Sequence, residues 1–190
     1  MQRAWRRKYS YEVHEGGIRT ADEREVQEDT QKDKYLTFRL ADESYGIDIS
    51  VVIEIIGIQP ITTVPEVPEY VRGIINLRGK IIPVVDMRLR FGKDFRTYTD
   101  RTCVIVIDVH EVPIGLIGDG VAEVLDITED HIVPPPSLKA AQNRYIRGIG
   151  KTGKADENIT LLLDWEKLFS PEEEIAMGEM PALAGDVNEN

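Results

Sequence analysis

Apolar and polar residues alternate along most of the chain between residues 35 and 170. In YLTFRL at 35–40, Leu36, Phe38 and Leu40 fall on one face of an extended segment. The stretches VVIEIIGI at 51–58 and CVIVI at 103–107 are rich in β-branched residues. A period of two with β-branched enrichment predicts many short strands.

Turn signals divide this strand-rich region into hairpins. A polar turn separates YLTFRL from DESYGIDI, Arg78-Gly79 divides GIINLRGKIIPVV, and Asp119-Gly120 marks a bulge or turn. Helical segments are few and short, and we expect them at 87–92, 137–145 and 164–169. Ser170 and Pro171 carry the residue types of an N-cap and a first helical position, so another short helix can begin there.

The strand pattern repeats itself along the chain. A shift of 69 residues brings Val52-Ile53-Glu54-Ile55 onto Val121-Ala122-Glu123-Val124. Further on, YVRGI at 70–74 matches YIRGI at 145–149, and IIPVVDMRLRF at 81–91 matches ITLLLDWEKLF at 159–169. The period is too long for a solenoid. It predicts a mainly β fold of two similar small barrels, one over about 35–95 and one over about 100–170.

Charge is distributed unevenly around this β region. The net charge is −11, and residues 171–190 carry six acidic side chains and no basic one. Residues 1–33 mix both signs of charge with little apolar surface, so we expect both ends to be solvated tails that can be removed at little cost. The acidic body disfavours a nucleic-acid partner, although an SH3-like nucleic-acid module remains a third and weaker alternative.

Candidate chemistry is sparse. The only cysteine, Cys103, begins an apolar strand, which is typical of a core residue, and none of the three histidines has a second ligand at metal-binding spacing. We therefore expect no cofactor and no metal. Asp86 and Asp164 occupy equivalent repeat positions and leave open an enzyme with paired carboxylates, but N-caps of the short helices that follow are the better interpretation.

No apolar run exceeds five residues, so the sequence offers no segment for membrane insertion. A single cysteine and the absence of a secretory signal predict a reduced, cytoplasmic protein.

Several segments together resemble the CheW family, the coupling proteins of bacterial chemotaxis. They are YGIDISVVIEII, VPEVPEYVRGIINLRGKIIPVVDMRLRFG, VIVIDV with VPIGLIGDGVAEVLDI, ITEDHIVPPP, and YIRGIGK with LLLDWEKLF. The match runs in order over 34–169, and the NLRG-x-IIPV-x-D core is its most specific part. The long segment at 1–33 departs from the usual compact form.

The resemblance implies two SH3-like five-stranded barrels packed side by side, which agrees with the repeat. It also implies a non-enzymatic adaptor that joins methyl-accepting chemoreceptors to the histidine kinase CheA. The implied partners are the regulatory domain of CheA, the cytoplasmic hairpin tip of a receptor and other CheW-like domains in rings. The implied location is the cytoplasm, with recruitment to membrane-associated receptor arrays.

The resemblance also assigns site residues. The kinase-facing residues would be Ile49, Val52 and Val121, with ordinary barrel core as the alternative. The receptor-facing residues would be Glu54, Asn76, Arg78, Gly79, Val104 and Gly115.

An ion pair is expected between Glu54 and Arg78, since the family places that glutamate near that arginine. Two unrelated solvated side chains are the alternative. From composition alone, Arg78 serves either the solubility of a hairpin tip or recognition of a partner.

Overall fold

The computed structural model describes residues 30–135, 144–153 and 158–185. The chain divides into two units, 1–32 and 33–190, and the strands among the described residues all belong to the second. Three predicted segments fall at least partly outside the described residues. They are the tail at 1–33, the helix at 137–145 and the end of the tail at 171–190. No described helix is long and apolar enough to cross a bilayer.

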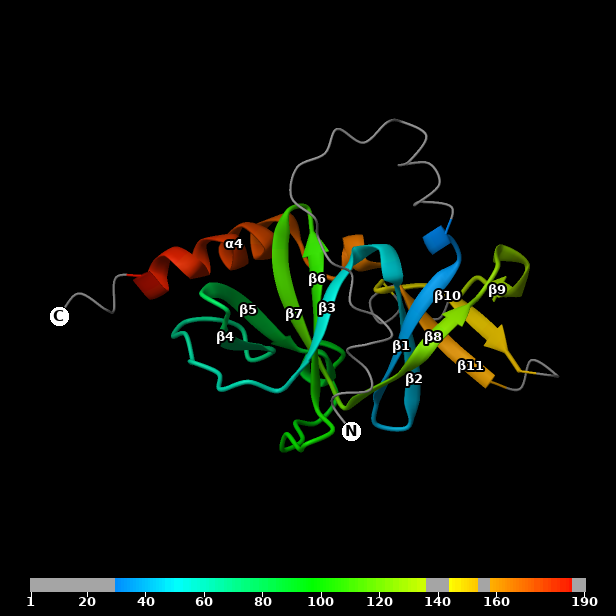
Figure 1. The fold of residues 1–190 in the computed structure, drawn as a ribbon, viewed down its shortest axis with the longest axis horizontal. Helices are drawn as coiled ribbons and strands as arrows, with labels where there is room; N and C mark the ends of the chain where they lie inside the picture. Colours follow the sequence, from blue (N-terminus) through cyan, green and yellow to red (C-terminus); the bar gives the residue numbers. More distant parts are fainter. Residues whose placement is uncertain (1–29, 136–143, 154–157, 186–190) are drawn as a thin grey trace. The chain divides into compact units, whose positions relative to one another are not determined.

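The second unit is mainly β and contains two sheets, as predicted (Figure 1). One sheet has the order β8-β1-β2-β11-β10-β9, and the other has the order β3-β6-β7-β5-β4. The strands of the first are β1 (Lys34–Leu40), β2 (Glu43–Asp48), β8 (Gly120–Asp126), β9 (Ile132–Val133), β10 (Ile146–Thr152) and β11 (Asn158–Leu163). The strands of the second are β3 (Val52–Gly57), β4 (Val71–Leu77), β5 (Lys80–Asp86), β6 (Cys103–Val109) and β7 (Val112–Gly118).

The helical segments are short, apart from the last one. They are η1 (Ile49–Val51), α3 (Met87–Arg90), η2 (Glu129–His131), η3 (Trp165–Lys167) and α4 (Pro171–Gly185). The segments α3 and η3 occupy the places predicted for helices at 87–92 and 164–169.

The strand order corrects the predicted barrel boundaries. The β1–β2 hairpin pairs with β8 on one side and, in parallel, with β11 on the other. The β6–β7 hairpin pairs in the same way with β3 and, in parallel, with β5. Each sheet therefore takes strands from both predicted ranges, 35–95 and 100–170, and the two-residue β9 gives the first sheet a sixth strand. The repeat was identified correctly, but its two copies exchange hairpins.

Both sheets close on themselves at equivalent points. Thr62 forms an antiparallel bridge with Ile74 of β4, and Val133 of β9 pairs with Ile149 of β10. The close approach at the first bridge requires glycine, because Gly73 has φ +133° and a Cβ there would lie 2.0 Å from the Thr62 carbonyl oxygen. Each sheet thus curls into a small SH3-like barrel.

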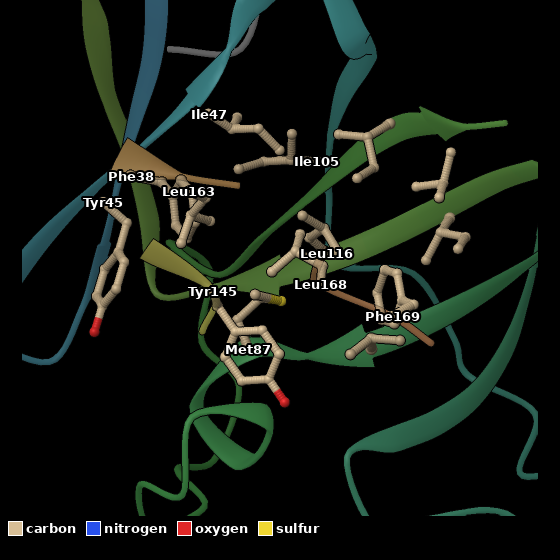
Figure 2. Packing of buried hydrophobic residues seen from close by; sticks show 14 of the residues in the cluster. Phe38, Tyr45, Ile47, Met87, Ile105, Leu116, Tyr145, Leu163, Leu168 and Phe169 are labelled. Atoms are coloured by element: carbon tan, nitrogen blue, oxygen red, sulfur yellow. The ribbon is translucent and has the colours of Figure 1, made fainter. Parts of the chain in front are cut away.

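The largest hydrophobic cluster lies between the two barrels. Figure 2 shows Phe38 and Leu163 of the first sheet packing toward Ile105 and Leu116 of the second. Leu36, Phe38 and Leu40, which the alternation placed on one face of a strand, all belong to this shared core. A smaller cluster fills each barrel, and β6 contributes to the shared core and to the second barrel in turn. Burial on both faces explains the continuous apolar run CVIVI.

The C-terminal helix α4 is part of the body, which corrects the prediction of a solvated tail at 171–190. It begins with a capping box, in which the Ser170 N–H donates to Glu173 Oε2 (2.7 Å) and the Glu173 N–H donates to Ser170 Oγ (3.3 Å). The helix lies along β5 and β7 (Figure 1) and buries Met177 and Met180 to 2% and 4% exposure.

Candidate docking surfaces

The β4–β5 hairpin ends in a tight two-residue turn at Arg78 and Gly79. Their φ values are +53° and +85°, which is the backbone of a type I′ turn. The Asn76 side chain accepts a hydrogen bond from the Gly79 N–H at 2.8 Å and fixes the turn from one side. Asn76, Arg78 and Gly79 are all exposed, so three of the predicted receptor-facing residues share one accessible hairpin end.

The predicted ion pair between Arg78 and Glu54 is confirmed. Arg78 Nη2 donates to Glu54 Oε1, and the two side chains are 68% and 26% exposed. Glu54 lies in β3 and Arg78 follows β4, and these strands form opposite edges of the five-stranded sheet. The pair therefore joins the two edges of the closed barrel and holds the guanidinium in a defined place.

Two predicted receptor-facing residues lie in the interior, and we withdraw them as contact residues. Val104 is 0% exposed, and Gly115 is buried between β6 and β5. A Cβ at Gly115 would lie 2.7 Å from Val104 and 2.8 Å from Val84. Both positions therefore serve the close packing of β5, β6 and β7. The prediction was wrong because β6 is buried on both faces.

The predicted kinase-facing residues are half-buried against the shared core. Val52 lies in β3 and Val121 in β8, and these are equivalent edge strands of the two sheets. Ile49 lies in η1 just before β3 and packs against the same core. Part of each side chain is accessible and part packs on the core, so a kinase contact at these residues stays a prediction.

Two exposed isoleucines on β3 were not singled out from the sequence. Ile53 is 50% exposed and Ile55 is 37% exposed, on either side of Glu54. The signal was present in VVIEII, where a glutamate interrupts an apolar run. Large apolar side chains on an edge strand mark a candidate contact surface for a protein partner.

The paired carboxylates Asp86 and Asp164 have local structural partners. Asp86 is 1% exposed and accepts hydrogen bonds from the N–H groups of Arg88 and Leu89, as predicted for an N-cap. Its other oxygen accepts from the Tyr98 hydroxyl at 2.9 Å. Asp164 precedes η3 without capping it through its side chain and pairs instead with Lys167. These contacts favour structural roles for both.

Two further kinds of reactive group, the Cys103 thiol and clusters of metal-binding side chains, give no sign of a reactive site among the described residues. Burial raises the pKa of the Cys103 thiol to about 11, which keeps it protonated at neutral pH. Among the described residues, no three His, Cys, Asp or Glu side chains are grouped as metal ligands.

Comparison with known proteins decides the family. The model of the CheW-like domain matches residues 34–173, which cover both barrels and the start of α4. The chain belongs to the CheW-like family. A chemotaxis protein CheW from Klebsiella aerogenes is 37% identical over 146 residues, which are 76% of this chain and 86% of that protein. A probable chemotaxis protein CheW from Rhizobium etli is 34% identical over 73% of this chain and 88% of its own length.

A solved CheW structure supports the same assignment. The crystal structure of the scaffolding protein TtCheW from Thermoanaerobacter tengcongensis superposes with a TM-score of 0.67 and is 40% identical. The match covers 73% of this chain and 92% of that one. The fold and the family name therefore agree with the resemblance identified from the sequence.

Proposed function

We propose that this CheW-like chain is a non-enzymatic adaptor that couples methyl-accepting chemoreceptors to the histidine kinase CheA, in the cytoplasm at receptor arrays. The observation that carries the proposal is the position of Arg78. Its side chain is 68% exposed, yet the tight turn fixes its backbone and Glu54 fixes its guanidinium. An exposed arginine held in place loses little conformational freedom on binding, which favours recognition over solubility.

The receptor-facing surface in this proposal consists of Glu54, Asn76, Arg78 and Gly79, together with Ile53 and Ile55, which the same strand β3 presents on its other, more exposed face. Arginine supplies fork-shaped hydrogen bonding, and the isoleucines supply apolar contact area. A helical hairpin that presents both polar and apolar side chains can use both kinds of contact.

The kinase-facing surface in this proposal is formed by the accessible parts of Ile49, Val52 and Val121. Two related edge strands present Val52 and Val121, and Ile49 lies in η1 just before the first of them, so a CheW-like domain of CheA, or of another adaptor in a ring, can meet similar surfaces on either barrel. The half-buried state of each side chain means that part of its apolar surface is still available to a partner.

Co-sedimentation tests the proposal. The purified chain is mixed with CheA and with receptor-containing membranes from the same organism, and pelleted protein and CheA autophosphorylation are measured. We expect CheA to pellet with the receptor only when the chain is present. We expect the chain alone to show no catalytic activity, including no autophosphorylation.

Arg78→Ala should remove the chain from the receptor pellet while CheA binding in solution persists. Lys80→Ala is the matched control, because Lys80 is another exposed cation on the same hairpin. The proposal fails if the wild-type chain does not bring CheA to the receptor pellet. The assignment of Arg78 fails if both alanine variants behave alike.

A further inference from the structure

Arg72 and Arg147 occupy equivalent positions in the two copies of the repeat, in YVRGI and YIRGI. Each lies at a bulge, because the register of β4 against β5 and of β10 against β11 shifts across the arginine in the same way. A bulge redirects the side chain of the extra residue. The two arginines are therefore an internal comparison of one structural position in two surroundings.

The second of these arginines, Arg147, has both a carboxylate and a hydroxyl partner within the fold. Arg147 Nη2 lies 2.6 Å from Glu129 Oε1, and its Nη1 donates to the Tyr35 hydroxyl at 3.2 Å. A carboxylate and a phenol thus share one guanidinium. This is a charge-assisted arrangement of the kind that arginine prefers.

The first arginine lacks the carboxylate. Arg72 interacts with the hydroxyl of Tyr98, which itself donates to Asp86 at 2.9 Å. Among the described residues, Arg72 forms no ion pair, and its Nε is buried with no hydrogen-bond partner. A buried donor without a partner is uncommon and calls for an explanation.

The lengths of two equivalent connections explain the difference. The N–H groups of Ile58 and Ile127 bond to equivalent carbonyl groups, and Thr62 and Val133 close the two barrels. Three residues lie between Ile58 and Thr62, and five lie between Ile127 and Val133. The longer connection forms η2, which supplies Glu129. The first copy has no such turn and so offers no carboxylate to Arg72.

An exposed aromatic ring lies beside the incomplete arginine. Phe95 is 47% exposed, and the Arg72 Cζ lies 4.9 Å from the centroid of its ring. Phe95 also contacts Tyr98 edge to face, with ring centroids 5.5 Å apart. Arginine and tyrosine are among the residue types that dominate binding energy at protein interfaces, and phenylalanine is enriched there.

We propose that Arg72, Phe95 and Tyr98 form a docking site for an acidic segment of a protein partner. An aspartate or glutamate of that segment takes the place at Arg72 that Glu129 takes at Arg147, and a neighbouring apolar side chain packs on Phe95. The site does not depend on the proposed receptor or kinase surfaces, since it uses none of their residues.

Nuclear magnetic resonance tests the site on the full ¹⁵N-labelled chain. The probe is a short capped peptide with two glutamates beside a leucine and a phenylalanine, and the control is the same peptide with glutamines. The Nε–H signal of Arg72 is assigned by its loss in Arg72→Lys. We expect this signal to shift saturably with the glutamate peptide, more weakly at high salt, and to stay in place with the glutamine peptide.

Variants separate this site from general attraction of an acidic peptide. Arg72→Gln should weaken the binding of the glutamate peptide by about tenfold or more. Arg147→Gln is the matched control and should change the affinity by less than about twofold. Phe95→Ala should also weaken the binding of the glutamate peptide. If circular dichroism shows that Arg72→Gln is unfolded, the Phe95→Ala result tests the site instead. An unmoved Arg72 signal, equal shifts with both peptides, or equal losses in the two arginine variants would overturn the proposal.

Discussion

Arg90 and Glu173 form a bidentate ion pair, in which Nη1 lies 2.9 Å from Oε1 and Nη2 lies 2.8 Å from Oε2. The Arg90 side chain is only 5% exposed and also donates to the Leu168 carbonyl oxygen. Its guanidinium lies 4.4 Å from the ring centroid of Tyr70 and 5.0 Å from that of Tyr145, which are equivalent residues of the repeat. One arginine thus joins both copies to α4.

Removing the carboxylate should therefore destabilise the whole unit. Glu173→Ala leaves a buried guanidinium without its counterion, and we expect a loss of about 2–3 kcal/mol in the free energy of unfolding. Glu179→Ala, an exposed position on the same helix, should change it by less than about 0.5 kcal/mol. Urea denaturation followed by circular dichroism measures both, and equal effects would exclude the ion pair as the cause.

The same carboxylate makes stability depend on pH. Burial alone would raise the pKa of Glu173, but hydrogen bonds from Arg90, Tyr70 and Ser170 outweigh it and hold the pKa below the ordinary 4.5. Because the pKa is lower in the folded state, its contribution is complete above pH 4.5 and is lost as the pH falls below that value. Glu173→Gln should therefore lower stability at pH 7 and reduce the difference from wild type toward pH 3. A constant difference across this range would contradict the pKa shift.

The Glu54–Arg78 pair predicts an effect on partner binding without a large effect on stability. Glu54→Arg and Arg78→Glu should each impair receptor coupling, and the double reversal should restore part of it. Because Arg78 is largely exposed and Glu54 is partly exposed, we expect each change to alter the free energy of unfolding by no more than about 1 kcal/mol. Receptor co-sedimentation and thermal melts measure the two quantities. A double variant no better than the singles would leave Arg78 alone as the contact.

The edge strand β8 predicts a kinase contact. Val121→Glu should reduce the affinity for CheA by about 2 kcal/mol or more, since it places a charge on an apolar contact surface. Ala122→Glu is the neighbouring exposed position and should leave the affinity nearly unchanged. Titration calorimetry measures the affinities, and circular dichroism verifies that Val121→Glu is folded. If a folded Val121→Glu variant binds CheA with unchanged affinity, Val121 is a core residue and not a kinase contact.

Gly73 should be among the least replaceable residues of the fold. Gly73→Ala places a Cβ against the Thr62 carbonyl oxygen at a φ that suits only glycine, so we expect a loss of more than about 3 kcal/mol. Gly57→Ala, with no atom within 4 Å of its Cβ, should cost less than about 1 kcal/mol. Chemical denaturation compares them, and similar losses would contradict the closure of the barrel through Thr62.

Local pattern predicted the strands, the Arg78–Gly79 turn and the Asp86 cap, because alternation, turn residues and capping residues act over a few positions. The barrel boundaries were wrong because alternation does not say which strands pair, and the parallel contacts β5–β7 and β2–β11 join distant segments. The start of α4 at Ser170 and Pro171 is predicted correctly, but its continuation and its packing are not, because Gly178 and Pro181 lower its intrinsic helicity. Its partners Arg90 and Tyr70 lie far away in the sequence.

Within the proposed receptor-facing surface, the hairpin turn and its ion pair were predictable from the sequence, whereas the burial of individual side chains was not. Glu54 and Arg78 were paired correctly, whereas Val104 and Gly115 turned out to support the sheet. Removal of residues 1–33 without loss of stability stays a prediction, since that segment lies almost entirely outside the described residues.

The exchange of hairpins between the two copies has a consequence for how the protein unfolds. Neither copy can detach without breaking a β1–β8 or β3–β6 ladder and opening the core that both sheets share. The two barrels should therefore melt together, with one calorimetric peak whose enthalpy equals the van't Hoff value. Tandem barrels that each used a single copy would be free to melt one after the other.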